Sequence, residues 1–146
     1  MNIFTIGYSK KSAKQFFGLV SSHEINLLVD VRLHNKSQLA GFTKGQDLAY
    51  FLKEICHCDY IHDEIFAPTD DILKSYRNKE ITWQQYVDRY LVLVNSRQCE
   101  TRFSEVVSNH SNICLLCTEP LPEQCHRRLL AEYLATKLPN VTIYHI

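Results

Sequence analysis

Short apolar runs alternate along this chain with longer segments whose apolar residues recur at helical spacing, and this alternation constrains the fold more than any other feature. The short runs lack the length of a helix and therefore predict strands. Five such runs are residues 3–6, 26–31, 59–62, 113–117 and 141–144. Strands that alternate with helices favour a mostly parallel sheet covered on both faces. We therefore predict a single α/β domain over residues 1–146, a three-layer Rossmann-like sandwich.

Polar capping signals indicate where the helices between these strands begin. Ser12 with Gln15, and Thr82 with Gln85, each have the spacing of a capping box. Pro122 suits the first turn of a helix, so the helix after the fourth strand is predicted to begin there. Further helices are predicted over residues 46–56, 70–77 and 102–110. The apolar face that follows Thr82 is interpreted as core rather than as a cofactor site; it comprises Trp83, Tyr86, Val87, Tyr90, Leu91 and Val94.

The composition fits one globular domain and excludes several classes of protein. The 146 residues have a formal net charge of zero, so no long-range field attracts the chain to nucleic acid, and binding there would need a local patch. No apolar window approaches the length of a membrane span, and no export signal opens the chain. We expect a cytoplasmic protein whose six cysteines are reduced thiols, metal ligands or catalytic groups. Neither a particular cofactor nor an oligomeric state is indicated.

The candidate site lies where strands of the predicted sheet end. In open α/β sheets ligands bind beyond the carboxyl ends of the strands, where the winding order reverses. A reversal after the third strand would place the first strand beside the fourth, so the loops after Ile6 and Cys117 become the predicted site. Arg32 can form a fork to a carboxylate or phosphate, and a structural ion pair with Asp30 is the alternative. The ligand-binding candidates in the early loops are Gly7, Tyr8, Ser9, Asp30 and Arg32.

The segment 117–127 holds the residues best suited to catalysis. Cys117 stands where a buried strand gives way to loop and helix, a position in which backbone N–H dipoles lower the pKa of a thiol, which favours a nucleophile. Glu119 and His126 are candidates for general base and acid. Arg127 would neutralise an anion. Cys125 is predicted to point toward the sheet and to approach Cys117.

Three chemistries compete for this cluster. A cysteine phosphatase or sulfur-transfer loop needs a compact anion cradle after its cysteine, with an arginine about six residues on in the phosphatase case, whereas Arg127 stands ten residues after Cys117. A zinc site could use Cys114, Cys117, Cys125 and His126, but Cys114 and Cys117 should point to opposite faces of one strand, and we assign no metal ligand. A redox couple of Cys117 and Cys125 would have an unusually wide spacing.

Three blocks of this sequence are similar to one known family. They are Gly7-Tyr8-Ser9 with Phe16, Asp30-Val31-Arg32 with Ser37, Gly41 and Phe42, and Leu116-Cys117-Thr118-Glu119 through Cys125-His126-Arg127. With Trp83, Tyr86 and Tyr90 as its aromatic helix, the chain resembles the domain of unknown function 488 family over essentially its whole length. It departs after Arg32, where members commonly place a proline before the serine, so this loop is expected to be shaped differently. The resemblance implies an α/β fold and a site built from these blocks, and it transfers no reaction.

These observations lead to one main hypothesis and two alternatives. The main hypothesis is an enzyme that acts on a phosphate-bearing or otherwise anionic ligand, such as a nucleotide or a nucleic-acid end, at the carboxyl edge of the sheet. The first alternative is a non-catalytic ligand-binding or regulatory module that uses the same cleft. The second is a thiol-redox or metal protein that uses Cys117 and Cys125. All three require Arg32 and Arg127 to lie at the same edge of the sheet.

Overall fold

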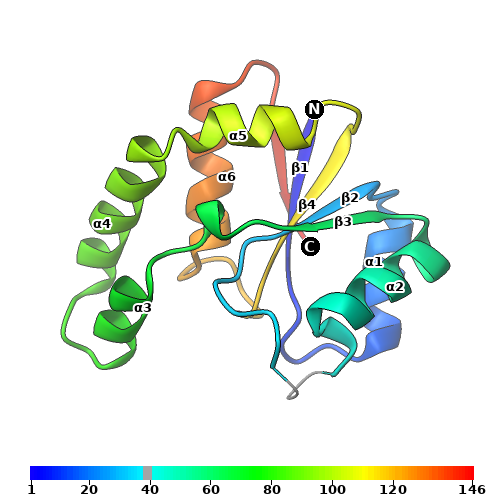
Figure 1. The fold of residues 1–146 in the computed structure, drawn as a ribbon, viewed down its shortest axis with the longest axis horizontal. Helices are drawn as coiled ribbons and strands as arrows, with labels where there is room; N and C mark the ends of the chain where they lie inside the picture. The colour runs from blue at the N-terminus through cyan, green and yellow to red at the C-terminus, as the bar shows by residue number, and fades with distance from the viewer. Residues whose placement is uncertain (38–40) are drawn as a thin grey trace.

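Five parallel strands form the centre of the molecule, in the order β3-β2-β4-β1-β5 (Figure 1). This computed structural model describes residues 1–37 and 41–146, so residues 38–40, inside the long loop expected after the second strand, lie outside the described residues. The strands are β1 (Asn2–Gly7), β2 (Leu27–Asp30), β3 (Asp59–His62), β4 (Asn112–Cys117) and β5 (Thr142–His145). The predicted α/β class is confirmed, and every strand pair in the described sheet is parallel.

Helices cover both faces of the sheet and give the predicted three layers (Figure 1). One face is covered by α1 (Ala13–Ser22) and α2 (Gly45–Cys56). The other is covered by α4 (Trp83–Ser96), α5 (Cys99–Val106) and α6 (His126–Lys137), with α3 (Asp70–Arg77) packed on α4. Short 3-10 turns lie at Gly41–Thr43 and Glu64–Phe66. Within the described ranges, no helix combines the length and apolar character needed to cross a membrane.

The alternation of side chains along each strand produces two separate cores. On β4, Ile113, Leu115 and Cys117 face the core under α4, α5 and α6, whereas Cys114 and Leu116 face the core under α1 and α2. This period of two is the geometry of an extended chain. The expectation that Cys114 and Cys117 point to opposite faces is therefore confirmed, and Cys117 belongs to the α6 side.

The strand order gathers three loops at one edge. The predicted neighbourhood of the first and fourth strands is confirmed, because β1 pairs with β4 from Asn2 opposite Asn112 to Gly7 opposite Cys117. β4 also pairs with β2, with Asp30 opposite Leu116. The fourth strand is therefore central, and the chain leaves β1, β2 and β4 at adjacent positions.

Both predicted capping boxes are confirmed. The Ser12 hydroxyl accepts from the Gln15 backbone N–H while the Gln15 side chain accepts from Ser12, and Thr82 and Gln85 repeat this exchange. The helix predicted over residues 102–110 is displaced, because α5 runs from Cys99 to Val106. The side chain of Cys99 is fully buried and α5 packs from its first turn, so burial rather than the periodicity of its last residues fixes where it begins.

The predicted start of the last helix at Pro122 is wrong. α6 begins at His126, and Cys125 is its N-cap with an extended backbone (φ −140°, ψ 136°). The Arg127 guanidinium donates to the carbonyl oxygens of Glu119 and Pro120, at 2.6 and 3.4 Å. These bonds tie the loop of residues 118–125 to the first turn of α6.

Candidate functional site

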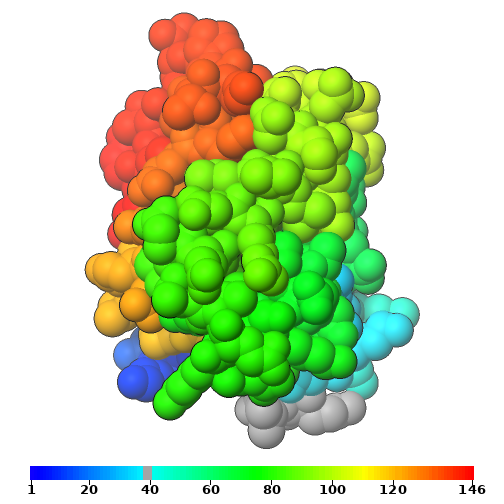
Figure 2. Space-filling model, turned by 90° about the vertical axis from the view of Figure 1, so that its left-hand side faces the viewer, coloured from blue at the N-terminus to red at the C-terminus, as the bar shows by residue number. Residues whose placement is uncertain are grey.

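A pocket of about 250 Å³ opens beyond the carboxyl ends of β2 and β4. Its lining comes from the loops after these strands, from the first turn of α6 and from α3 and α4. In Figure 2 the green surface of α3 and α4 borders the orange surface of the residues that follow β4. Five residues predicted for the site line the pocket: Arg32, Cys117, Glu119, Cys125 and His126.

Cys117 and Cys125 form a buried pair of hydrogen-bonded thiols. The pKa of Cys117 lies below its ordinary value, first because the Cys125 thiol donates a hydrogen bond to it. The backbone N–H groups of Thr118 and Glu119 and the charge of Arg127 act in the same direction, against the effect of burial. The pKa of Cys125 is raised, because its proton is held by the Cys117 sulfur and because it is buried. The lowered pKa of Cys117 favours its thiolate form.

Arg127 is a buried cation beside this pair. Its side chain is only 1% exposed, and its Nη1 donates to the Cys125 sulfur at 3.3 Å as well as to the carbonyl of Glu119. Its Nε has no hydrogen-bond partner, and among the described residues no carboxylate forms an ion pair with it. A buried charge without a counter-charge is costly, so this guanidinium favours a negative charge on the neighbouring thiols.

Arg127 does not line the pocket, although the sequence placed it there as an anion-binding group. Its guanidinium lies behind the 118–125 loop, where it joins the loop carbonyls to the first turn of α6. It nevertheless lies at the same edge of the sheet as Arg32, because Arg32 lines the pocket and Arg127 contacts Cys125, which also lines it. The two arginines are therefore on the same side of the molecule, as the hypothesis requires, but of the two only Arg32 lines the pocket.

His126 lies against the Cys117 sulfur in a fixed orientation. Its Nε2 is 2.8 Å from the carbonyl oxygen of Val31, and since a carbonyl only accepts, Nε2 donates its hydrogen there. The Cys117 sulfur is 3.8 Å from Nδ1 and 3.9 Å from Nε2. Tyr90 packs edge-on against the imidazole, with ring centroids 5.6 Å apart. In the neutral ring, Nδ1 is therefore the nitrogen that can accept a proton.

Asp30 and Arg32 form a buried ion pair, as the structural alternative expected. The guanidinium binds the carboxylate at two points, Nε to Oδ1 at 2.8 Å and Nη2 to Oδ2 at 2.7 Å. Tyr60 donates to Asp30 Oδ2 at 2.7 Å, and Arg32 also donates to the Thr43 carbonyl at 2.7 Å. The Tyr8 ring lies 5.2 Å from the guanidinium carbon. This network holds the loop after β2, which also supplies the Val31 carbonyl.

The Gly7-Tyr8-Ser9 loop braces the site from the side of β1. Its backbone N–H groups were predicted to bind a ligand. Instead, the Tyr8 N–H donates to the Cys117 carbonyl at 3.2 Å and the Ser9 N–H to the Thr118 carbonyl at 3.1 Å. A Cβ atom on Gly7 would overlap the Glu119 carbonyl oxygen and lie 3.2 Å from Arg127 Nη1. Glycine is needed here because the 118–125 loop, rather than a ligand, approaches its backbone.

The pocket has an aromatic wall that the sequence did not predict. Trp83 and Tyr86 were assigned to the core, and they also line this pocket together with Tyr76 of α3. Trp83 and Tyr86 stack at 5.0 Å with an interplanar angle of 18°, and Tyr76 donates to Gln124 Oε1 at 3.0 Å. The short connection from α3 to the cap of α4 was the available signal, because it brings the end of one helix beside the start of the other.

Three side chains at this site could supply ligands to a soft metal ion. Within the described residues, the donor atoms of Cys117, Cys125 and His126 lie within 4.8 Å of one another. His126 would offer Nδ1, since Nε2 is bound to the Val31 carbonyl, an arrangement typical of histidine ligands. Cys114 cannot join them, because it faces the opposite core.

The comparisons with known proteins concern the family alone. The family described as Domain of unknown function DUF488 matches residues 12–134, a span that contains the second and third blocks noted in the sequence. Comparison with curated proteins and with solved structures finds no match. Because the matched span covers well over half of the chain, the resemblance is confirmed, and the chain belongs to the DUF488 family.

Proposed function

We propose that this protein is an enzyme that uses the Cys117 sulfur as a nucleophile on an anionic substrate bound in the pocket between β4, α3 and α4. The observation that carries the proposal is the buried Arg127 guanidinium, which among the described residues has the thiol pair rather than a carboxylate beside it. A cation in this position stabilises a thiolate, which is the reactive form of cysteine.

The arrangement suggests how the proton would move during such a reaction. The Cys117 thiolate attacks the electrophilic atom of the substrate, a sulfur–substrate bond forms, and the bond to the leaving group breaks. Cys125 gives its proton to the leaving group, and the resulting Cys125 thiolate is stabilised by Arg127, whose Nη1 already contacts that sulfur. Water or a second substrate then takes the transferred group, and its proton returns to the thiol pair.

An anionic substrate is supported by the charges around the pocket. The mouth of the pocket carries Arg77, and Glu119 is the acidic residue among its described lining residues. The fork of Arg32 is already filled by Asp30, so we assign Arg32 to the support of the pocket wall and Arg77 to contact with the ligand.

Alkylation followed by site-resolved mass spectrometry tests the nucleophile. Since the pKa of Cys117 is lowered, its reaction with iodoacetamide should begin at a pH below that of an ordinary thiol. Cys99 is the control, because it is also buried and burial raises its pKa to about 11. For Cys117, the ratio of its rate with anionic iodoacetate to its rate with iodoacetamide should be higher than the same ratio for free cysteine in solution.

The outcome that would contradict the proposal is a Cys117 reaction rate that rises only near the pKa of free cysteine. Cys117→Ser should abolish the fast reaction and leave the modification of Cys99 unchanged. Binding of anionic ligands without any covalent adduct at Cys117 would support the non-catalytic module instead.

Metal binding is the second candidate, favoured by the close approach of Cys117, Cys125 and His126. Cobalt(II) added to the reduced protein would give an intense thiolate-to-metal absorption if these residues bind it tightly. A stoichiometric band that disappears in Cys125→Ser would assign the cluster to a metal. The absence of a band would reject this candidate.

A further inference from the structure

The wall of the pocket opposite the thiols is aromatic. Tyr76, Trp83 and Tyr86 line it, with ring centroids 5.0–5.6 Å apart. Trp83 and Tyr76 are only partly buried, so their surfaces contribute to the pocket as well as to the core. Aromatic walls of this kind bind flat rings by stacking, and such contacts tolerate many ring types.

A cation without a described partner lies beside this wall. Arg77, at the end of α3, is exposed, and among the described residues no carboxylate forms an ion pair with it. The other arginine and lysine side chains near the mouth have partners: Arg32 pairs with Asp30, Lys74 pairs with Asp70, and Arg97 donates to backbone carbonyls. Among the described residues at this mouth, Arg77 is therefore available to an anion, and a guanidinium suits the two-point recognition of phosphate.

The pocket also continues outward past Arg77. A second hollow of about 760 Å³ shares Leu33, His34, Leu73 and Arg77 with it. The two adjoining hollows together extend from the buried thiols, past the aromatic wall, to the side of α3. This arrangement has room for a ligand with a flat apolar part and a charged group at its end.

We propose that this pocket binds a planar aromatic ring linked to a phosphate, as in a nucleoside monophosphate, with the ring against Trp83 and Tyr76 and the phosphate at Arg77. The inference rests on the proposed function, since it names the substrate class of the same site. It assigns a binding role to α3 and to the start of α4, which the nucleophile alone does not require.

Trp83 provides a direct measurement, because it is the single tryptophan of the chain. Its fluorescence can be titrated with adenosine 5′-monophosphate, phenyl phosphate, ribose 5-phosphate and adenosine. We expect saturable quenching by adenosine 5′-monophosphate, with ribose 5-phosphate and adenosine binding at least about tenfold more weakly, because each lacks one of the two recognised groups. Phenyl phosphate shows whether a simple aryl ring suffices or a nucleobase is needed. Isothermal calorimetry on the same set detects binding that leaves the fluorescence unchanged.

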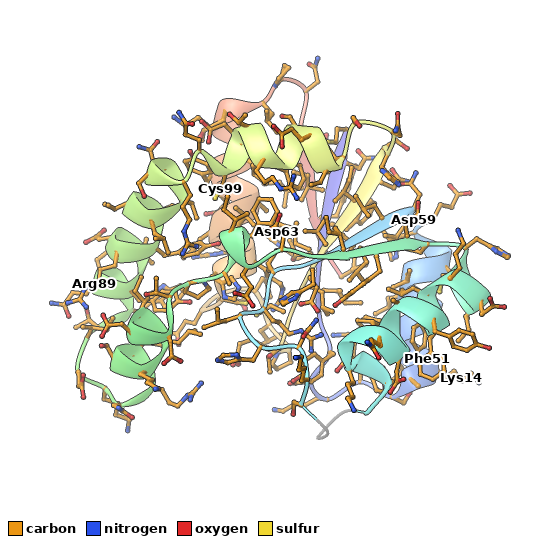
Figure 3. All side chains as sticks on the ribbon, in the orientation of Figure 1. Lys14, Phe51, Asp59, Asp63, Arg89 and Cys99 are labelled. Carbon is orange, nitrogen blue, oxygen red and sulfur yellow. The ribbon has the colours of Figure 1, made fainter. Side chains whose placement is uncertain are left out.

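Matched variants assign the phosphate contact. Arg77→Ala should weaken binding of the nucleotide about tenfold and leave binding of adenosine unchanged, as expected for one charge-assisted contact. Arg89→Ala is the control, since Arg89 lies on the outer side of α4, away from the pocket (Figure 3). Tyr76→Ala should instead weaken binding of the nucleotide and of adenosine alike.

The two proposals can fail separately. Cys117→Ser should keep nucleotide binding, so binding without any reactivity of Cys117 would leave this inference standing and overturn the nucleophile. A reactive Cys117 in a protein that binds neither the nucleotide nor phenyl phosphate, by fluorescence and by calorimetry, would overturn this inference alone. Equal loss of binding in Arg77→Ala and Arg89→Ala would also overturn it.

Discussion

Two buried arginines at neighbouring positions of the sheet edge have opposite environments. Arg32, after β2, is 4% exposed and meets a fully buried carboxylate, Asp30, through two hydrogen bonds. Arg127, in the first turn of α6, is 1% exposed and donates to two carbonyl oxygens and one sulfur. Within the described residues, the first cation is neutralised by an acid and the second is not.

This difference between the two arginines assigns Arg32 to the support of the site and Arg127 to the proposed reaction. An arginine paired at two points with a carboxylate forms a fixed link, because both charges are satisfied and neither can leave without a large cost. An arginine surrounded by neutral dipoles stabilises whichever nearby group becomes negative, and here that group is a thiol. The loop after β2 therefore holds the geometry of the site, whereas the residues from Cys117 to Arg127 supply its charge.

The largest effect should come from breaking the paired arginine. Asp30→Asn leaves the Arg32 charge buried without a partner and should lower the free energy of unfolding by about 3–5 kcal/mol. Urea denaturation followed by circular dichroism measures this change. Lys74→Ala is the control, since its ion pair with Asp70 is exposed and should matter little. A small effect of Asp30→Asn would show that Arg32 does not depend on its carboxylate.

The next largest effect should come from the close approach between the loops of β1 and β4. In Gly7→Ala the added methyl group meets a backbone carbonyl, that of Glu119, which must shift. We expect a loss of about 1–3 kcal/mol in stability and slower alkylation of Cys117, because the same loop supplies N–H groups to its sulfur.

Gly18→Ala is the matched control for this substitution. Gly18 lies within α1, and nothing is found within 4 Å of the position that its Cβ would occupy. It should raise the stability by about 0.5–1 kcal/mol, through the higher helix propensity of alanine. Equal behaviour of the two variants would show that the approach of Glu119 to Gly7 is not a constraint.

The sequence predicted the layers and the edge of the sheet at which the site lies, because both follow from local patterns. The spacing of apolar residues identifies each element, and parallel strands bring their carboxyl ends to one edge whatever their exact order. The position of β4 between β1 and β2 cannot be predicted from local sequence patterns. It depends on how far the connection from β1 to β2 crosses the sheet, and this connection leaves one strand position free between them.

The environment of the two arginines could not be predicted for a different reason. The spacing of Asp30 and Arg32 is compatible both with a mutual pair and with ligand binding, and only the packing of Tyr60 and Thr43 around them decides. Arg127 is part of a helix, but its guanidinium donates to carbonyls of the preceding loop. From the sequence, part of that loop was predicted to be helical. Long-range side-chain contacts have no fixed sequence spacing.

Removing the unpaired cation should have a moderate effect on reactivity. In Arg127→Met the thiolate loses its neighbouring charge, so the pKa of Cys117 should rise and its alkylation rate at neutral pH should fall about tenfold, which is one pKa unit. The pH at which the alkylation of Cys117 begins should rise by about one unit. Alkylation of Cys99 measures any general change in access. A rate unchanged at every pH would mean that Arg127 does not stabilise the thiolate.

The hollow on the α1/α2 side of the sheet differs from the candidate site in its chemical character. There the hollow between Phe17, Phe42, Phe51 and Ile55 is almost entirely apolar, with Lys14 at its rim (Figure 3). Its described lining residues include no cysteine, and Cys56, which follows Ile55, has a pKa raised by burial. The buried thiol pair and the Arg127 guanidinium of the proposed reaction lie on the α6 side of the sheet.

The smallest effect should come from removing one hydrogen bond of the Asp30–Arg32 network while its ion pair stays intact. Tyr60→Phe removes one hydrogen bond to Asp30, whose carboxylate keeps both bonds from Arg32, so the stability should fall by only about 1 kcal/mol. The Val31 carbonyl and His126 should stay in place, since the ion pair that holds their loop survives. Alkylation of Cys117 should then follow the pH profile of the wild type, in contrast to Arg127→Met. A shifted profile in Tyr60→Phe would mean that the two regions are coupled, and that the division between a supporting and a charged arginine does not hold.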